Sequence, residues 1–296
     1  MQPTLAYKIQ GLGKQSPVTA FCFDHQMCYV AQTIKQDTVI TRCDLGDSKA
    51  VATADKITLQ NFVNVHSLAL FQSAPKLDLV VCGQPIGVNG QVTAPELWYV
   101  AVDADSQEDQ PRIFKITHLE SANITGTPLP APVIGAVSAL SSDHNELTVM
   151  VLDKAQHLQC SVYNMQQVSQ MIWQMIEADK AAIEAGDFDM MANVYQSFKP
   201  TAKQLAPDTI GSIQSIAFSN GRAIYATKSY GAQQQVSKGF WLLKNGFHDQ
   251  SIDGLTADTS LTGIALFGKY VYFGVVQKSN DSYSNTIHRV EKTLWK

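Results

Sequence analysis

Charged side chains and long hydrophobic runs are scarce in this sequence of 296 residues. Only 16% of the residues are charged, against about 25% in an average globular protein. The formal net charge is −4 and the pI is near 5.9, so the overall field does not favour nucleic acid, whose binding proteins are usually basic. No run of about 18 apolar residues occurs, so we expect no transmembrane segment. The first residues lack a basic segment followed by an apolar one, so no signal peptide is expected there.

Cysteine is also sparse, and its pattern does not suggest a disulfide framework. The five cysteines are Cys22, Cys28, Cys43, Cys82 and Cys160. Their number is odd, the chain is long and no CxxC motif occurs. Four of them lie in apolar, strand-like segments, which predicts small buried thiols. A bridge between Cys22 and Cys28 across a tight turn is the alternative.

Familiar catalytic and metal-binding motifs are missing as well. The sequence has no GxSxG, HExxH, Walker A or GxGxxG motif. No two of the seven histidines stand at the spacing of metal ligands. His66 and His288 lie within expected strands, where core or edge positions are the simplest interpretation. We therefore expect no metal, no cofactor and no enzymatic activity.

A short pattern that recurs five times is the main positive feature. Each copy begins with an aliphatic residue, has small residues at positions three and five, and usually has a large apolar residue at position four. The copies start near residues 18, 65, 137, 213 and 261 and read VTAFCF, VHSLAL, VSALSS, IQSIAF and LTGIAL. Alternation in a strand places the small residues on one face and the large ones on the other. Such asymmetry favours strands that converge on an axis, where large residues of one sheet press against small residues of the next.

The segments that follow each copy define the predicted fold. Two further strand-like segments follow every copy, and a third follows four of them, which predicts an all-β, five-bladed β-propeller formed by residues 1–296 as one domain. In the fourth unit the third strand is expected at residues 240–243. The fifth unit lacks an outer strand, so we expect residues 5–9 to close the last blade. A β-sandwich split over two domains is the alternative.

One insertion, around residues 165–185, has a helical pattern instead. Its apolar residues form a stripe with helical spacing. Asn164 is the expected N-cap with Gln167 three residues later, and Gly186 is the expected stop. We expect this helix to pack on the outside of a blade rather than on a membrane, because its polar face has few basic residues. A partner-binding helix is the alternative.

Polar segments between the second and third strands are the candidate binding loops. Glutamine, of which the chain has 26, is frequent there together with hydroxyl and aromatic residues. These side chains suit neutral sugars, whose hydroxyl groups need hydrogen bonds and whose C–H faces stack on rings. The candidate ligand-binding residues are Gln84, Lys228, Tyr230, Lys278, Asn280 and Tyr283. A propeller glycosidase is an alternative, with Asp208 and Asp258 as its candidate acids.

Three stretches resemble the helveticin J family, the large heat-labile bacteriocins of lactobacilli. They are residues 136–164, 212–229, and 261–276 with 287–295. The resemblance covers about half of the chain, from residue 133 onward. It implies an antibacterial protein that is secreted or held at the cell surface and needs no cofactor. It also implies the surface of related bacteria, or its glycans, as the partner.

This family has no catalytic motif that can be carried over to residues of this chain. The five cysteines depart from the pattern of exported proteins of such bacteria, which tend to avoid free thiols. A non-catalytic intracellular propeller that serves as a scaffold for protein interactions is therefore the alternative.

Overall fold

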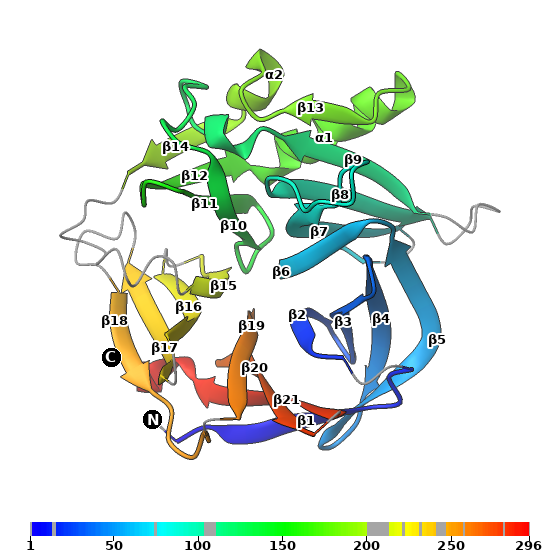
Figure 1. Ribbon diagram of the computed structural model, residues 1–296, viewed down its shortest axis with the longest axis vertical. Coiled ribbons are helices and arrows are strands. Elements are labelled where there is room, and N and C mark those ends of the chain that lie inside the picture. Colours follow the sequence, from blue (N-terminus) through cyan, green and yellow to red (C-terminus); the bar gives the residue numbers. More distant parts are fainter. Residues whose placement is uncertain are drawn as a thin grey trace.

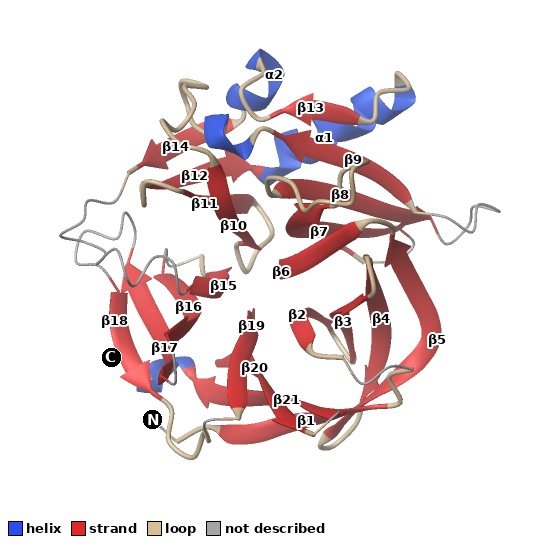
Figure 2. Cartoon of the chain, in the orientation of Figure 1, coloured by secondary structure: helices blue, strands red, loops and turns tan. Residues whose placement is uncertain are grey.

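The computed structural model describes residues 2–13, 16–73, 76–103, 111–199, 213–220, 223–230, 233–240, 247–256, 258–280 and 282–295. Over these residues the chain is rich in strands and has few helices, which confirms the all-β prediction. The strands form four hydrogen-bonded sheets around a common centre (Figures 1 and 2). The largest sheet has eight strands in the order β19-β20-β21-β1-β5-β4-β3-β2.

The antiparallel pairings divide the strands into groups of four, which we call units, and the eight-stranded sheet contains two of these groups joined by a parallel pair. Unit 1 consists of β2 (Val18–Asp24), β3 (Met27–Ile34), β4 (Asp37–Leu45) and β5 (Lys49–Leu59). Unit 2 consists of β6 (Phe62–Gln72), β7 (Lys76–Pro85), β8 (Glu96–Asp103) and β9 (Arg112–Thr117). Unit 3 consists of β10 (Val133–Leu140), β11 (Glu146–Asp153), β12 (Leu158–Asn164) and β14 (Val194–Phe198). Unit 4 consists of β15 (Ile213–Phe218), β16 (Ala223–Tyr230), β17 (Gln233–Phe240) and β18 (Phe247–Ser251). Unit 5 consists of β19 (Thr259–Phe267), β20 (Tyr270–Ser279), β21 (Ser282–Glu291) and β1 (Thr4–Gln10).

The five copies of the sequence pattern lie in β2, β6, β10, β15 and β19, which are the innermost strands (Figure 1). Buried described residues form five hydrophobic clusters, one between each pair of neighbouring units. On β2, the large Phe21 faces unit 5, whereas the small Ala20 and Cys22 face unit 2. On β15 of unit 4, the large Ile216 faces unit 3, whereas the small Ala217 faces unit 5. The expected packing of large residues against small ones is therefore what joins the units.

Unit 5 shows this close packing in its tightest form. Gly263 lies on β19 at the small third position of the pattern. A Cβ atom built there would lie 2.9 Å from the Cα of Ala20 and 3.1 Å from the backbone nitrogen of Phe21. Because backbone atoms cannot move aside without disturbing β2, only glycine fits at this junction between units 5 and 1.

The first strand closes the ring of units, as predicted. β1 pairs antiparallel with β21, with Leu5 opposite His288, and pairs parallel with β5 of unit 1. The backbone N–H of Val18 donates to Asn285 Oδ1 at 2.8 Å, across 267 residues of sequence. Hydrogen bonds and a shared core thus hold the two ends of the chain together without a covalent link.

The insertion packs on the outside of units 2 and 3, as expected. Helix α1 (Met165–Glu177) begins at Asn164, whose side chain accepts the backbone N–H of Gln167 at 3.1 Å. The Tyr99 hydroxyl lies 2.6 Å from Asp78 and 3.1 Å from Ser169, so it anchors the helix to unit 2. The apolar stripe of α1 is buried in the cluster between units 2 and 3.

The predicted end of this helix was wrong. It ends at Glu177 rather than near Gly186, because Asp179 takes a left-handed conformation with φ 58°. The backbone N–H groups of Ala178 and Lys180 then satisfy the last helical carbonyls. The chain continues as β13 (Ala182–Glu184), which pairs parallel with β9, and the short helix α2 (Phe188–Met191). Two short 3₁₀-helices, η1 (Leu119–Ser121) and η3 (Lys292–Leu294), complete the described helices.

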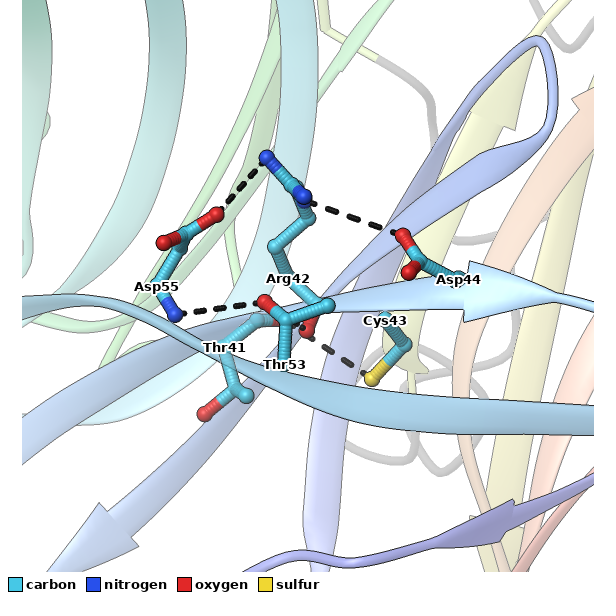
Figure 3. Close-up of polar contacts among 6 residues, drawn as sticks. All are labelled: Thr41, Arg42, Cys43, Asp44, Thr53 and Asp55. Carbon is cyan, nitrogen blue, oxygen red and sulfur yellow. Dashed lines mark hydrogen bonds and ion pairs between the residues drawn. The ribbon is translucent and has the colours of Figure 1, made fainter.

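The prediction of buried thiols is confirmed, because all five cysteines are free and buried. Polar contacts, and not disulfide bonds, join the outer strands of unit 1. At an irregularity between Thr41 and Cys43, the Arg42 guanidinium lies 2.7 Å from Asp55 and 3.8 Å from Asp44 (Figure 3). These carboxylates are exposed, so each ion pair contributes less than about 1 kcal/mol.

Candidate functional site

The two ends of the central axis have different structures. The C-terminal halves of all five inner strands line one cavity, so these strands run in the same direction and finish at the same end, which we call end B. The opposite end, end A, contains the starts of the inner strands and the connections between second and third strands. The predicted binding residues fall at end A, whereas the cavity opens at end B.

At end A the structure brings some predicted residues together and separates others. Lys278 and Tyr283 are directly opposite each other on β20 and β21. Asn280 lies in the turn between these strands with φ 51°. Gln84 belongs to unit 2, where its side chain donates to the Thr93 carbonyl at 3.1 Å and accepts from Asn64 at 2.9 Å. Gln84 also borders an open groove of about 740 Å³, opposite the segment 128–134.

The prediction that these residues lie in loops was wrong except for Asn280. Gln84, Lys228, Tyr230, Lys278 and Tyr283 lie in strands. In unit 4 the third strand, β17, begins at Gln233, earlier than predicted, and residues 241–243 of the predicted strand lie outside the described residues. Polar residues continue both hairpins because cross-strand hydrogen bonds, not side-chain hydrophobicity, extend the ladder there. Tyr230 is the last residue of β16; its side chain lies outside the described residues.

Lys228 is not available at the surface. Its side chain is 2% exposed, and its ammonium lies 2.7 Å from Asp249 and 4.6 Å from the centre of the Phe247 ring. Burial lowers the pKa of Lys228, and the Asp249 carboxylate opposes that shift. Ser237 also donates to Asp249 at 2.6 Å. This lysine is an internal group of unit 4, so it is not retained as a ligand contact.

Only one of the two candidate acids of the glycosidase alternative lies among the described residues. Asp258 precedes β19 at end A and is exposed, and its backbone carbonyl accepts the N–H of Lys278 at 3.1 Å. Asp208 lies outside the described residues. Their separation therefore stays untested.

The end-B cavity has a volume of about 570 Å³. Most of its wall consists of small and apolar residues of the inner strands, joined by aromatic and polar groups at the rim. The aromatic residues are Phe23, Phe71, Phe218 and Phe267, from units 1, 2, 4 and 5. Small-molecule sites have this combination of a mainly apolar wall and a few polar groups, with volumes of roughly 300–1,000 Å³.

The polar groups of the cavity include one carboxylate, one ammonium and two imidazoles, those of His25 and His144. Asp24 is the single carboxylate among the described residues of the wall, and its side chain is 7% exposed. Lys292 donates to the Gly268 carbonyl at 2.8 Å, and burial lowers its pKa. His144 Nδ1 lies 3.0 Å from the Phe71 carbonyl. Because a carbonyl only accepts, Nδ1 carries the proton of this hydrogen bond.

An aromatic cluster borders the cavity at the junction of units 5 and 1. The rings of Phe23 and Phe267 are 5.4 Å apart, and Phe23 lies 4.7 Å from Tyr272. Tyr7 of the closing strand stacks on Tyr272 at 6.4 Å. Phe267 is 38% exposed, whereas Tyr272 is buried beneath. The cluster therefore presents a supported aromatic surface to solvent.

Sequence analysis missed this site. Each phenylalanine at position six or seven of the repeated pattern looks like an ordinary core residue, and only the convergence of the strands brings four of them around one hollow. Their recurrence at the same place in four copies was the available signal.

Two other properties concern the described part of the chain. No three histidine, cysteine or acidic side chains there come together as a metal site. No helix in the described ranges is long and apolar enough to span a membrane.

Solved structures of several proteins share this fold. A tail fibre of Staphylococcus aureus phage P68 aligns with a TM-score of 0.54 at 10% identity, over 98% of this chain and 52% of the fibre chain. The chain thus spans about half the length of that fibre. A GH43_1 enzyme from Xanthomonas citri aligns at 0.53 and 8% identity, over 97% and 89% of the two chains. A GH43 β-1,3-galactosidase aligns at 0.56 and 7% identity, over 99% and 64%.

These likenesses correct one expectation from the sequence. The absence of catalytic motifs led us to expect a non-enzyme, but glycoside hydrolases are among the proteins with this fold. Motifs report only local spacing, so their absence does not exclude catalysis by residues that the fold brings together from separate units.

Sequence comparison identifies the family more directly. No curated protein matches the sequence. The model of the bacteriocin helveticin-J family, however, matches residues 1–293. The match includes the first 130 residues, for which the sequence patterns indicated only a similar architecture. The chain belongs to the bacteriocin helveticin-J family.

Proposed function

We propose that this protein is a five-bladed β-propeller of one domain, residues 1–296, that binds the surface of related bacteria and inhibits their growth. The family match over residues 1–293 carries the proposal. The five four-stranded units and their closure by β1 support the blade number. Secretion, or retention at the cell surface, is part of the same proposal.

Cell-wall glycans are the proposed surface ligand. The residues proposed for this contact are Gln84, Tyr230, Lys278, Asn280 and Tyr283, whose side chains are amides and phenols apart from the ammonium of Lys278. Such groups exchange hydrogen bonds with sugar hydroxyls and stack on sugar C–H faces. The net charge of −4 gives no general attraction to anionic wall polymers, so recognition by hydrogen bonds and stacking is favoured over recognition by charge. The phage tail fibre has the same fold, which is consistent with a binding role.

An inhibition assay joined to a cell-wall pull-down tests this function. Purified protein is spotted on lawns of lactobacilli and of unrelated bacteria, and is mixed with purified walls of each. We expect growth inhibition zones and sedimentation with walls for the lactobacilli. Failure of both would contradict the proposal. Binding without inhibition would keep the surface ligand and remove the killing role.

The same incubation also measures hydrolysis. Reducing sugar released from the walls, compared with a heat-inactivated sample, separates a glycoside hydrolase from a protein that only binds. Fractionation of the producing culture tests the location. Protein found only inside the cells, with reduced cysteines, would favour the intracellular scaffold.

A further inference from the structure

We propose that the cavity at end B is a binding site for one sugar ring of a neutral glycan, held by stacking on Phe267 and Phe23 and by hydrogen bonds to Asp24. This site lies at the opposite end of the axis from the residues predicted from the sequence. The wall glycan as its natural source rests on the proposed function, but the site itself rests on the geometry of the cavity.

The aromatic surface suits the C–H face of a sugar. Phe267 is 38% exposed at the rim, and its ring lies at 32° to that of Phe23, 5.4 Å away. Phe23 is held from behind by Tyr272 and by Phe21, whose ring centre is 5.5 Å distant. Because the supporting rings are packed, little side-chain entropy is lost when a ligand stacks on this surface.

One largely buried polar group of the wall lacks an adequate partner. The ion-pair partner of Asp24 among the described residues is His25, at 3.9 Å. His25 is almost fully exposed, so water weakens this interaction. Buried polar groups normally have partners, and the hydroxyl groups of a sugar supply both donors and acceptors.

The charges of the cavity favour a neutral ligand over an ion. Its wall combines the carboxylate of Asp24 with the ammonium of Lys292, and Lys292 is already bonded to the Gly268 carbonyl. An anion would meet Asp24 and a cation would meet Lys292. A neutral ring with many hydroxyl groups meets neither penalty, and it matches the mixture of phenyl rings, serines and two imidazoles.

Variants of the two key groups test the site in the full chain. Phe267→Leu keeps the apolar volume but removes the ring, whereas Phe267→Tyr keeps the ring. Asp24→Asn keeps the shape but removes the charge and one acceptor. Phe240→Leu and Asp44→Asn are matched controls, because Phe240 is an exposed phenylalanine and Asp44 an exposed aspartate that do not line the cavity.

Sedimentation with purified lactobacillus walls is the first readout. We expect Phe267→Leu and Asp24→Asn each to weaken binding about tenfold, a change equivalent to about 1.4 kcal/mol. Phe267→Tyr, which keeps the ring, should bind more tightly than Phe267→Leu, and both controls should bind like the unmodified protein. Thermal unfolding identifies a variant that has lost its fold. In that case, the wall binding of Phe267→Leu compared with that of Phe267→Tyr decides whether the cavity is the site.

Unchanged binding by Phe267→Leu and Asp24→Asn would overturn the cavity site and leave the proposed function intact. If the unmodified protein does not bind walls, the proposed function fails separately. An array of neutral oligosaccharides then decides on the cavity. Any glycan bound by the unmodified protein and lost in both cavity variants supports the site, and the absence of such a glycan overturns it.

Discussion

The two ends of the axis show how differently polar and concave surfaces are encoded. At end A, the polar residues are consecutive in the sequence and lie in hairpins such as β20–β21. At end B, the cavity is formed by residues from all five inner strands, separated by up to about 240 positions in the chain. A polar rim can be recognised from local composition, whereas a cavity requires the strands to converge. We therefore expect end B to contribute more to ligand affinity, because it can enclose a sugar ring.

The junction of units 5 and 1 gives the largest expected effect, because both ends depend on it. Gly263→Ala places a methyl group against the backbone of β2, where the nearest atoms are 2.9 and 3.1 Å away. We expect the free energy of unfolding to fall by about 3 kcal/mol, and wall binding through either end to decline with it. Denaturant unfolding measures the change.

Gly135 provides the control for this substitution. It also lies on an inner strand, β10, but a Cβ atom there has no neighbour within 4 Å. Gly135→Ala should leave stability unchanged or raise it by about 0.4–1 kcal/mol. Equal losses of stability in the two variants would show that strand propensity, rather than the packing between units, explains the effect of Gly263→Ala.

Lys228 and Asp249 give the next largest effect and separate structure from binding in unit 4. Asp249→Ala leaves the buried ammonium of Lys228 without its carboxylate, and we expect a loss of about 2 kcal/mol. Lys228→Met leaves only a partly exposed carboxylate, so its cost should be smaller. Urea denaturation compares the two variants.

Wall binding by Lys228→Met sharpens the comparison further. It should match the unmodified protein, because Lys228 is buried. The double variant Lys278→Ala/Tyr283→Ala should bind two- to threefold more weakly, about 0.5 kcal/mol. If Lys228→Met keeps its fold but loses most of its wall binding, Lys228 is a ligand contact and end A is favoured as the binding site.

The last effect concerns pH. Burial lowers the pKa of His66, at end A, below its usual value of 6.5. Below pH 6.5 the unfolded chain therefore binds a proton that the folded protein excludes, so stability is complete above this pH and falls as the pH decreases. The slope from this residue is at most about 1.4 kcal/mol per pH unit.

His66→Gln tests this dependence. Unfolding curves between pH 7 and pH 5 should show a shallower loss of stability in the variant than in the unmodified protein. His288, whose pKa is also lowered by burial, accounts for part of the remaining slope. An identical slope in both proteins would show that His66 does not contribute.

Much of the fold follows from the sequence because its determinants are local. The alternation of small and large residues located all five inner strands, and Asn164 with Gln167 located the start of α1. The third strand of unit 4 begins earlier than predicted, at Gln233, because the apolar run at 240–243 outweighed the polar residues of β17 in the prediction. The burial of Lys228 depends on Asp249, 21 residues later, and no local pattern predicts that pairing. The cavity was missed for the same reason, since its phenylalanines come from four units.

Hydrogen–deuterium exchange with a soluble wall polysaccharide tests the central claim most directly. The account predicts that saturating polysaccharide slows exchange chiefly at residues 22–25 and 264–268, which border the cavity. Residues 277–283 at end A should change less. Protection confined to end A, with unchanged exchange around the cavity, would contradict the account.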